Sequence, residues 1–335
     1  MSATMQDVAK LAGVSVKTVS NVVNGYPYIR ETTKEKVLAA IAELDYQMNV
    51  QARSLRSGKT GMIGLAVPEL SLPYFAELAD TVIEYAESVG LTVLIEQTGS
   101  NREREREALH GFRRNLTDGL IFSPLALGPD DVDLFKVNYP LVLLGERVFN
   151  AQVDHVTMHN VEGARAATAH LIAQGCKRIA VVGAHEGEVV GSAQLRTEGY
   201  LQALKDHGIE TDPALIREAG LWHRSTGAQA LFDLIEDGIE FDGIFALNDA
   251  MALGVLYALQ TSGKRIPKDV KVIGFDDVEE GQYSFPTLSS VSPGRQQIAS
   301  TAVNLLKERI DNPGQNIAPR RVLADYSISV RESTR

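Results

Sequence analysis

The stretch GVSVKTVSNVVNG (residues 13–25) sets the tightest limit on how the start of this chain can fold. Thr4 followed three residues later by Asp7 is typical of a capped helix start, and Gly13 suits a helix end that needs a positive φ. Ser15 can then cap a second helix directly after that glycine. Two short helices joined by a glycine-containing turn form a helix-turn-helix.

Apolar side chains recur at helical spacing through the first 45 residues and predict a three-helix core. We expect the third helix over residues 32–44. The predicted core positions of the three helices are Val8, Leu11, Ala12, Val19, Val22, Val23, Val37, Leu38, Ile41 and Leu44.

The amino-terminal end of the second helix carries side chains that suit the major groove of DNA, where this helix enters in a helix-turn-helix. Lys17 can donate to guanine, Asn21 can pair with adenine, and Val16 can pack on a thymine methyl. Short donors suited to phosphate oxygens are Thr18, Ser20 and Asn24. The alternative is a small helical bundle whose polar face is accidental.

The segment NVQARSLRSGKTG (residues 49–61) allows two interpretations. It is polar, so it can be a solvated linker. It can also be a short basic helix in which Leu55, with Ala52, enters the minor groove as an apolar wedge beside Arg56. A helix this short is marginal in water, so we expect it to order only against DNA or a partner copy.

Charge is distributed unevenly along the chain. Residues 1–60 hold eight Lys or Arg against five Asp or Glu, a net charge of +3. Because the whole chain carries a net charge of −10, residues 61–335 carry −13. A small basic module joined to a large acidic one is expected when only one end meets a polyanion.

The sequence also bears on the location of the protein. It has no apolar run long enough for a membrane span, no secretory signal, and a single cysteine, Cys176. We therefore expect a cytoplasmic protein without a membrane partner.

From residue 62 onward, apolar runs alternate with amphipathic segments, which predicts parallel sheets flanked by helices. The pattern restarts near Asn160, so we expect two similar α/β lobes. Predicted strands cover residues 62–68, 91–97, 119–123, 140–145, 155–158, 178–183, 243–248 and 270–275. Predicted helices cover residues 76–89, 103–115, 163–174, 193–207, 228–236 and 250–261.

Polar and aromatic side chains stand at or just after the carboxyl ends of the predicted strands, where open α/β sheets bind ligands. They are Tyr74, Phe75, Ser123, Asn248, Asp249 and Asp276, together with Arg196 and Trp222 in later segments. Aromatic faces and paired acidic and basic groups suit a neutral sugar. Each residue also has a structural alternative, such as a helix cap, a core position or an ion pair.

Other features of the sequence do not predict a metal, cofactor or catalytic site. The run NREREREALHGFRR predicts a solvated helix face. His155 and His159 lack a third ligand, so we expect no metal site. GAHEGEVVG does not match a dinucleotide motif, and no catalytic constellation is present. We therefore expect no cofactor and no enzymatic activity.

Two segments, MQDVAKLAGVSVKTVSNVVNG and NVQARSLRSGKTGMIGL, resemble the lactose-repressor/galactose-repressor (LacI/GalR-type) family of bacterial transcription regulators. The resemblance implies a helix-turn-helix domain over residues 1–48, a hinge helix and linker over 49–60, and a periplasmic-binding-protein-like core over 61–335. Its two lobes are expected at about 61–159 with 292–318, and 160–291 with 319–335.

The resemblance also assigns residues to two sites. The implied DNA-binding residues are Thr4, Ser15, Val16, Lys17, Thr18, Ser20, Asn21, Asn24, Tyr28, Ala52, Leu55 and Arg56. The implied effector-binding residues are Tyr74, Phe75, Ser123, Glu146, Arg147, Met158, Arg196, Trp222, Asn248, Asp249 and Asp276.

The chain departs from the family pattern at four places. Asn21 replaces a frequent Arg, and Arg30 replaces the usual Ser cap of the third helix. Val190 stands where purine-responsive relatives carry a second Arg, which disfavours a purine effector. Glu146 and Arg147 stand where a cleft-facing Asp is expected.

The sequence therefore predicts a sugar-responsive repressor that binds a palindromic operator as a homodimer. The alternatives are a sugar-binding protein without a role in transcription, an α/β enzyme acting on sugars, and a regulator whose effector is a purine or a phosphorylated metabolite. Removal of residues 1–60 separates a DNA-binding regulator from the first two alternatives, because in a regulator it should abolish DNA binding while ligand binding survives.

Overall fold

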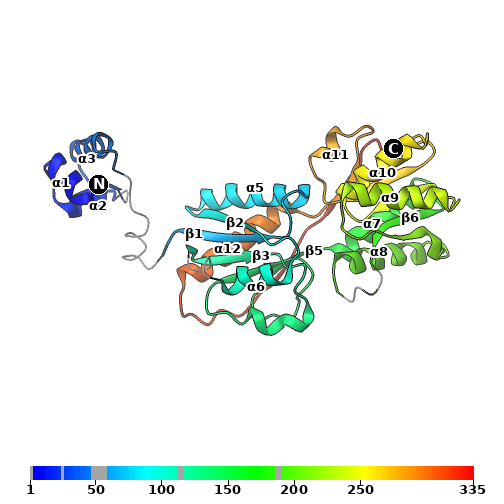
Figure 1. The fold of residues 1–335 in the computed structure, drawn as a ribbon, viewed down its shortest axis with the longest axis horizontal. Helices are drawn as coiled ribbons and strands as arrows, with labels where there is room; N and C mark the ends of the chain where they lie inside the picture. Colours follow the sequence, from blue (N-terminus) through cyan, green and yellow to red (C-terminus); the bar gives the residue numbers. More distant parts are fainter. Residues whose placement is uncertain (1–2, 24–25, 47–58, 112–115, 186, 188–189) are drawn as a thin grey trace. The chain divides into compact units, whose positions relative to one another are not determined.

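The computed structural model describes the chain except residues 1–2, 24–25, 47–58, 112–115, 186 and 188–189 (Figure 1). It divides into two compact units, residues 1–60 and residues 61–335. Among the described residues, no helix is both long enough and apolar enough to cross a membrane.

The first unit contains three short helices, whose starts and ends follow the local signals in the sequence. They are α1 (Met5–Ala12), α2 (Val16–Val23) and α3 (Glu31–Glu43). The Asp7 amide donates to Thr4 Oγ1 (3.3 Å), the Thr4 amide donates to Asp7 Oδ2 (2.9 Å), and Gly13 ends α1 with φ +67°. The Thr18 amide donates to Ser15 Oγ (3.1 Å) at the start of α2. The predicted helix-turn-helix is confirmed.

The core of this unit differs from the predicted apolar stripes at two positions. Leu11 is 45% exposed and Leu38 is 48% exposed, whereas Ala9 and Ala40 are buried. Three helices this short enclose few positions, and the small alanines occupy the places where the helices approach each other. Arg30 makes no side-chain cap to α3, in line with its replacement of the usual Ser.

The second unit contains two six-stranded sheets, which confirms the predicted two-lobed α/β core (Figure 1). The first sheet has the order β11-β5-β4-β3-β1-β2 and the second has the order β12-β10-β9-β8-β6-β7. All pairings are parallel except that of β10 with β12. The strands of the first sheet are β1 (Met62–Val67), β2 (Thr92–Gln97), β3 (Gly119–Phe122), β4 (Leu141–Leu144), β5 (Asp154–Met158) and β11 (Arg321–Ala324). The strands of the second sheet are β6 (Ile179–Ala184), β7 (Ile216–Glu218), β8 (Gly243–Ala246), β9 (Lys271–Phe275), β10 (Ser289–Ser292) and β12 (Ser327–Ser329).

Helices complete two lobes. The first lobe, built on the first sheet, carries α5 (Pro73–Ser88), α6 (Arg102–His110), the 3₁₀ helix η2 (Pro129–Phe135) and α12 (Arg295–Asp311). The second lobe, built on the second sheet, carries α7 (Asn160–Ala173), α8 (Ser192–Asp206), η3 (Pro213–Leu215), α9 (Arg224–Glu236), α10 (Asp249–Thr261) and α11 (Glu280–Tyr283). Side chains of β1, β3, β4, β6 and β8 are almost entirely buried, because helices cover both faces of each sheet.

The chain passes between the lobes three times, and the last passage corrects a predicted boundary. The passages lie between β5 and α7, between β10 and α12, and between β11 and β12. We expected residues 319–335 in the second lobe, but β11 pairs with β5 in the first sheet. The parallel register of Arg321 with His155 places β11 at the edge of that sheet, so the boundary falls near residue 325.

Glycines let the helices of the second lobe pack backbone to backbone. Helix α8 packs on α7, and α10 packs on α9. A Cβ added at Gly199 would collide with the Val161 carbonyl of α7, and one added at Gly254 would collide with the Arg224 carbonyl of α9. Neither helix pair can approach this closely with a larger residue at these positions.

We therefore expect Gly254→Ala to lower the free energy of unfolding of residues 61–335 by about 3 kcal/mol, because backbone must move to admit the methyl group. Urea denaturation followed by circular dichroism measures this loss. Gly220→Ala is the matched control, since its added Cβ meets no atom of the described residues within 4 Å. Equal stability of the two variants would contradict the close packing.

Candidate functional site: a cavity between two lobes

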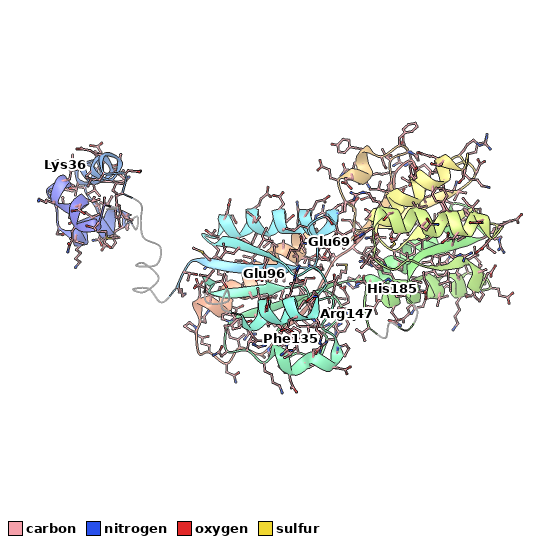
Figure 2. All side chains as sticks on the ribbon, in the orientation of Figure 1. Lys36, Glu69, Glu96, Phe135, Arg147 and His185 are labelled. Carbon is pink, nitrogen blue, oxygen red and sulfur yellow. The ribbon has the colours of Figure 1, made fainter. Side chains whose placement is uncertain are left out.

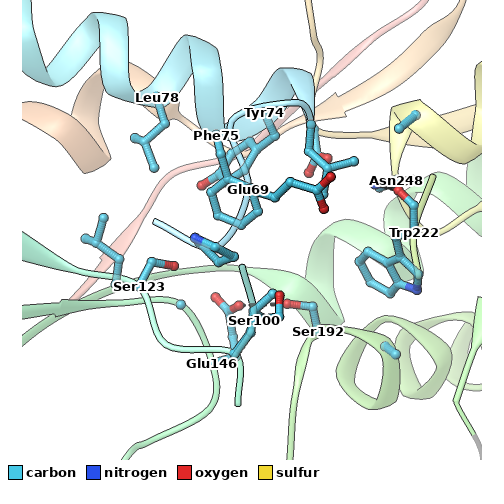
Figure 3. Close-up of a pocket in the computed structure, with 18 of the residues that line it drawn as sticks. Glu69, Tyr74, Phe75, Leu78, Ser100, Ser123, Glu146, Ser192, Trp222 and Asn248 are labelled. Carbon is cyan, nitrogen blue, oxygen red and sulfur yellow. Dashed lines mark hydrogen bonds between the residues drawn. The ribbon is translucent and has the colours of Figure 1, made fainter. Parts of the chain in front are cut away.

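A cavity of about 190 Å³ lies in the second unit, where the carboxyl ends of the strands of both lobes face each other (Figure 3). The cavity is lined by ten of the eleven predicted effector residues, which are Tyr74, Phe75, Ser123, Glu146, Arg147, Met158, Arg196, Trp222, Asn248 and Asp276. The convergence of strand ends that the sequence predicts is therefore present in the fold.

Aromatic side chains stand on opposite sides of the cavity (Figure 3). Tyr74 and Phe75 lie in the first turn of α5 with ring centroids 5.2 Å apart, edge to face. Trp222 precedes α9, and its indole N–H donates to the Gly183 carbonyl (2.9 Å). Asn248, the N-cap of α10, accepts from the Met251 amide (2.8 Å) and donates to the Trp222 carbonyl (3.2 Å). These bonds hold the indole ring against the cavity.

Arg196 is the buried cation of the site. Its Nε donates to Asn160 Oδ1 (2.8 Å), and Nη1 donates to the Leu247 carbonyl. Nη1 also lies 3.5 Å from Asp276 Oδ1, and the guanidinium carbon lies 3.6 Å from the centroid of the Phe275 ring. The guanidinium is thus fixed from several directions before a ligand arrives.

Asp276 follows β9 in an unusual backbone conformation, with φ +118°. Its amide donates to the Val291 carbonyl (2.8 Å), and its carbonyl accepts from Arg295 (3.3 Å), which holds the backbone in place. Burial raises the pKa of Asp276 to about 7, against the lowering effect of Arg196 and Arg295. Its carboxyl group can therefore change charge near neutral pH.

Asp249 corrects the prediction for the site, because it does not line the cavity. It is fully buried as the first residue of α10, where its carboxylate accepts from Ser290 Oγ (2.7 Å) and the Val278 amide (2.9 Å). Burial, followed by the charge of Asp276, raises its pKa well above the ordinary value. Asp249 therefore fixes the chain after β9 rather than facing a ligand.

The predicted DNA-binding residues lie in the first unit. Val16, Lys17 and Tyr28 are exposed, whereas Thr18, Ser20 and Asn21 are half-buried. The Thr4 and Ser15 side chains cap α1 and α2. Outside the described residues lie Asn24, Ala52, Leu55, Arg56 and residues 49–58 of the predicted hinge helix and linker.

Comparison with known proteins places this arrangement in a family. Residues 4–49 match the model for bacterial regulatory proteins of the lacI family, and residues 168–334 match a periplasmic binding protein-like domain. A ribose operon repressor of Halalkalibacterium halodurans is 35% identical over 332 residues, which cover 99% of this chain and 97% of that repressor. The chain belongs to the LacI family of bacterial regulators.

Two further similar proteins support this family assignment. An HTH-type transcriptional repressor PurR of Pasteurella multocida is 31% identical over 319 residues, 94% of each chain. The crystal structure of the Lac repressor dimer bound to operator and the anti-inducer ONPF matches with a TM-score of 0.84 at 28% identity, covering 100% of this chain and 99% of that one. This LacI-family chain is a DNA-binding repressor, and its relatives are repressors rather than enzymes.

The lobes of this LacI-family protein are joined by polar contacts that the sequence analysis missed. His223 Nε2 lies 3.0 Å from Glu69 Oε2, and Ser192 Oγ donates to Glu146 Oε2 (2.8 Å). Arg147 donates to the Val190 carbonyl (2.8 Å), so side chains of the first lobe reach the second at several points. Figure 2 marks Glu69, Arg147 and His185 where the lobes meet. Nothing in the local sequence signals these partners, because each pair joins segments that are distant in the chain.

Glu105 corrects another prediction. The charged run containing it was expected to be a solvated helix face, yet Glu105 is fully buried. Its carboxylate accepts from the amides of residues 125–127 at 2.7–3.1 Å. These hydrogen bonds fix the loop that brings Ser123 and Leu125 to the cavity wall. A single buried acid within an otherwise charged helix face carries no periodic signal.

We expect Asp276 to make this repressor less stable as pH rises. Its pKa is about 7 in the fold against an ordinary 3.8, so between these values the folded state holds a proton that the unfolded chain has released. The free energy of unfolding then falls with rising pH by at most about 1.4 kcal/mol per pH unit for this one group. Urea unfolding of the wild type and Asp276→Asn from pH 5 to pH 8 tests this.

The variant should show a flatter profile than the wild type over that window. Asp130→Asn, at an exposed aspartate, serves as the control and should follow the wild type. Parallel profiles for the wild type and Asp276→Asn would contradict the assignment of a raised pKa to Asp276.

Proposed function

We propose that this LacI-family repressor binds a neutral sugar in the cavity between its lobes, and that the sugar controls its affinity for a palindromic operator in the cytoplasm. The observation that carries the proposal is the placement of Tyr74, Phe75 and Trp222 around the buried pair of Arg196 and Asp276. Aromatic faces contact the C–H side of a sugar ring, while the charged pair exchanges hydrogen bonds with its hydroxyls.

The charges of the cavity favour a neutral ligand over a phosphorylated one. Three acidic side chains, those of Glu69, Glu146 and Asp276, line it together with two arginines. The guanidinium of Arg196 is already bound to Asp276, Asn160 and a backbone carbonyl. A phosphate would enter against these acids, and the two arginines of the cavity, Arg147 and Arg196, already donate to protein acceptors.

The first unit supports sequence-specific recognition. We propose that Val16, Lys17 and Asn21 of α2 contact base edges, while Thr18, Ser20 and Asn24 position the unit on phosphates. Thr4, Ser15 and Tyr28 complete this surface, with the first two supporting the helix starts. We propose that Ala52, Leu55 and Arg56, which lie outside the described residues, contact the minor groove.

We propose that the repressor acts as a homodimer. Apolar side chains are exposed on the outer strand β2, at Leu94 and Ile95, and on the second lobe, where Tyr283 is 79% exposed and Phe285 is 87% exposed. A second copy covering these side chains would bury apolar surface and pair two recognition helices with two half-sites.

A thermal-unfolding screen of the full chain against neutral sugars, purines and sugar phosphates tests the proposed effector. At 100 times its dissociation constant a ligand stabilises the folded state by about 2.7 kcal/mol, and we expect this shift from a neutral sugar. The shift should vanish in Trp222→Ala and Arg196→Ala and persist in Asp130→Asn. A shift from a purine or a phosphate alone would overturn the sugar assignment and leave the repressor assignment standing.

The proposed wedge makes a separate prediction. Leu55→Ala should weaken binding to the operator at least tenfold, because an apolar side chain no longer opens the central base step, and should leave binding to random-sequence DNA nearly unchanged. Fluorescence anisotropy at one fixed salt concentration measures both affinities. An equal loss on both DNAs would contradict the wedge.

A further inference from the structure

Asp277, the residue after Asp276, lies outside the cavity lining but shares its strained backbone. Asp276 has φ +118° and Asp277 has φ +50°, so two consecutive residues with side chains depart from the ordinary negative φ. Such conformations cost free energy and persist only where the surrounding contacts impose them. The contacts of this pair therefore identify what holds the Asp276 carboxyl group in the cavity.

The backbone amides that follow Asp276 are fixed by side chains of α10 and β10. The Asp277 amide donates to Ser290 Oγ (3.0 Å), and the Val278 amide donates to Asp249 Oδ2 (2.9 Å). Ser290 Oγ in turn donates to Asp249 Oδ1 (2.7 Å). These hydrogen bonds do not involve the carboxylate of Asp277, which has partners of its own.

The Asp277 carboxylate binds the carboxyl-terminal segment of the chain, residues 327–335. Its Oδ1 accepts from Arg331 Nη2 (2.7 Å), and its Oδ2 accepts from Ser329 Oγ at the end of β12 (2.8 Å). Arg331 is itself fixed, because its Nη1 donates to the Leu288 carbonyl (2.7 Å). Less than a fifth of either side chain of the ion pair is exposed, so water and salt screen it only weakly.

We propose that Asp277 is a positioning residue: by binding the carboxyl-terminal segment, it holds the strained turn that directs Asp276 toward Arg196. The inference rests on the proposed function, because it takes the cavity as the ligand site. Residues 327–335 then control the affinity for the ligand, although none of them lines the cavity.

The effect of losing this anchor follows from the strain. Without it, the backbone of Asp276 and Asp277 can relax toward negative φ, where most residues lie. This rotation turns the Asp276 carboxyl group away from the Arg196 guanidinium, which lies 3.5 Å from it. A ligand then loses one hydrogen bond to a charged group, which corresponds to about a tenfold loss in affinity.

The test compares Asp277→Gly with the wild type in the full chain. Glycine adopts φ +50° without strain and has no carboxylate, so the variant removes the anchor without adding a steric conflict. Isothermal titration calorimetry uses ribose, glucose and cellobiose as probes, with hypoxanthine as a purine. Asp277→Gly should bind the probe that the wild type binds about tenfold more weakly. Unchanged affinity would overturn the inference.

Further variants separate this anchor from a general loss of stability. Asp277→Asn tolerates the positive φ and keeps one acceptor oxygen, so it should retain more affinity than Asp277→Gly. Arg331→Gln added to Asp277→Gly should cause little further loss, because the two residues act through one contact. Losses that add in full would overturn the inference. Asp237→Asn breaks an ion pair with Arg217 outside the cavity lining and should bind as the wild type.

A ligand-free measurement separates the inference from the proposed function. Crystal structures of the wild type and Asp277→Gly give the distance between Arg196 Nη1 and Asp276 Oδ1. We expect more than about 4 Å in the variant, beyond the reach of an ion pair. If no probe binds, or hypoxanthine alone binds, the sugar assignment fails, and this distance still decides the role of Asp277. An unchanged distance would overturn that role.

The pH dependence of unfolding gives a second ligand-free result. If Asp277 contributed to stability alone, Asp277→Gly would lower the free energy of unfolding equally at every pH. Movement of Asp276 instead changes the pKa of its carboxyl group, and with it the slope of the urea-unfolding profile from pH 5 to pH 8. Parallel profiles of Asp277→Gly and the wild type would contradict the positioning role.

Discussion

The burial of the Arg196 guanidinium is the constraint on which the ligand cavity depends. A guanidinium removed from water must have its donors satisfied, and no single loop can supply all the acceptors. Here they come from Asn160 at the start of α7, the Leu247 carbonyl after β8 and Asp276 after β9. One side chain therefore fixes three chain segments that surround the cavity. The removal of any acceptor leaves a buried charge partly unsatisfied, so the cavity wall tolerates little change at these positions.

Much of the fold could be predicted because its signals are local. Thr4, Gly13 and Ser15 fix the helix ends of the first unit through caps, and apolar runs mark the strands of both sheets that are buried on both faces. Strands β10 and β12 could not be found in this way. They are short and rich in serine, and their pairing depends on distant parts of the chain. The position of β11 beside β5 is likewise decided by a crossover that no local pattern encodes.

The location of the site could be predicted from the sequence, but the contacts between its residues could not. The ends of strands identify which residues can face a cavity, but this rule does not distinguish Asn248 from Asp249. The geometry of α10 decides between them, because it turns Asn248 toward the cavity and buries Asp249 beneath it. Glu69, Ser192 and His223 belong to the site through contacts across the lobes. Glu105 shapes it from an otherwise charged helix. Such roles arise from tertiary structure, where a side chain acts through a partner far away in sequence.

Strand β1 has the ligand cavity near one end and the connection to the first unit at the other. It runs through the interior of the first sheet between β2 and β3, and it begins just after Gly61, whose amide is held by Asp118 (2.8 Å). Its other end leads to Glu69, which contacts the second lobe. Six extended residues span about 20 Å with little compliance, because both neighbouring strands brace them. The strand therefore forms an extended connection, braced on both sides, between the loop that lines the cavity and Gly61, where the chain leads back to the first unit.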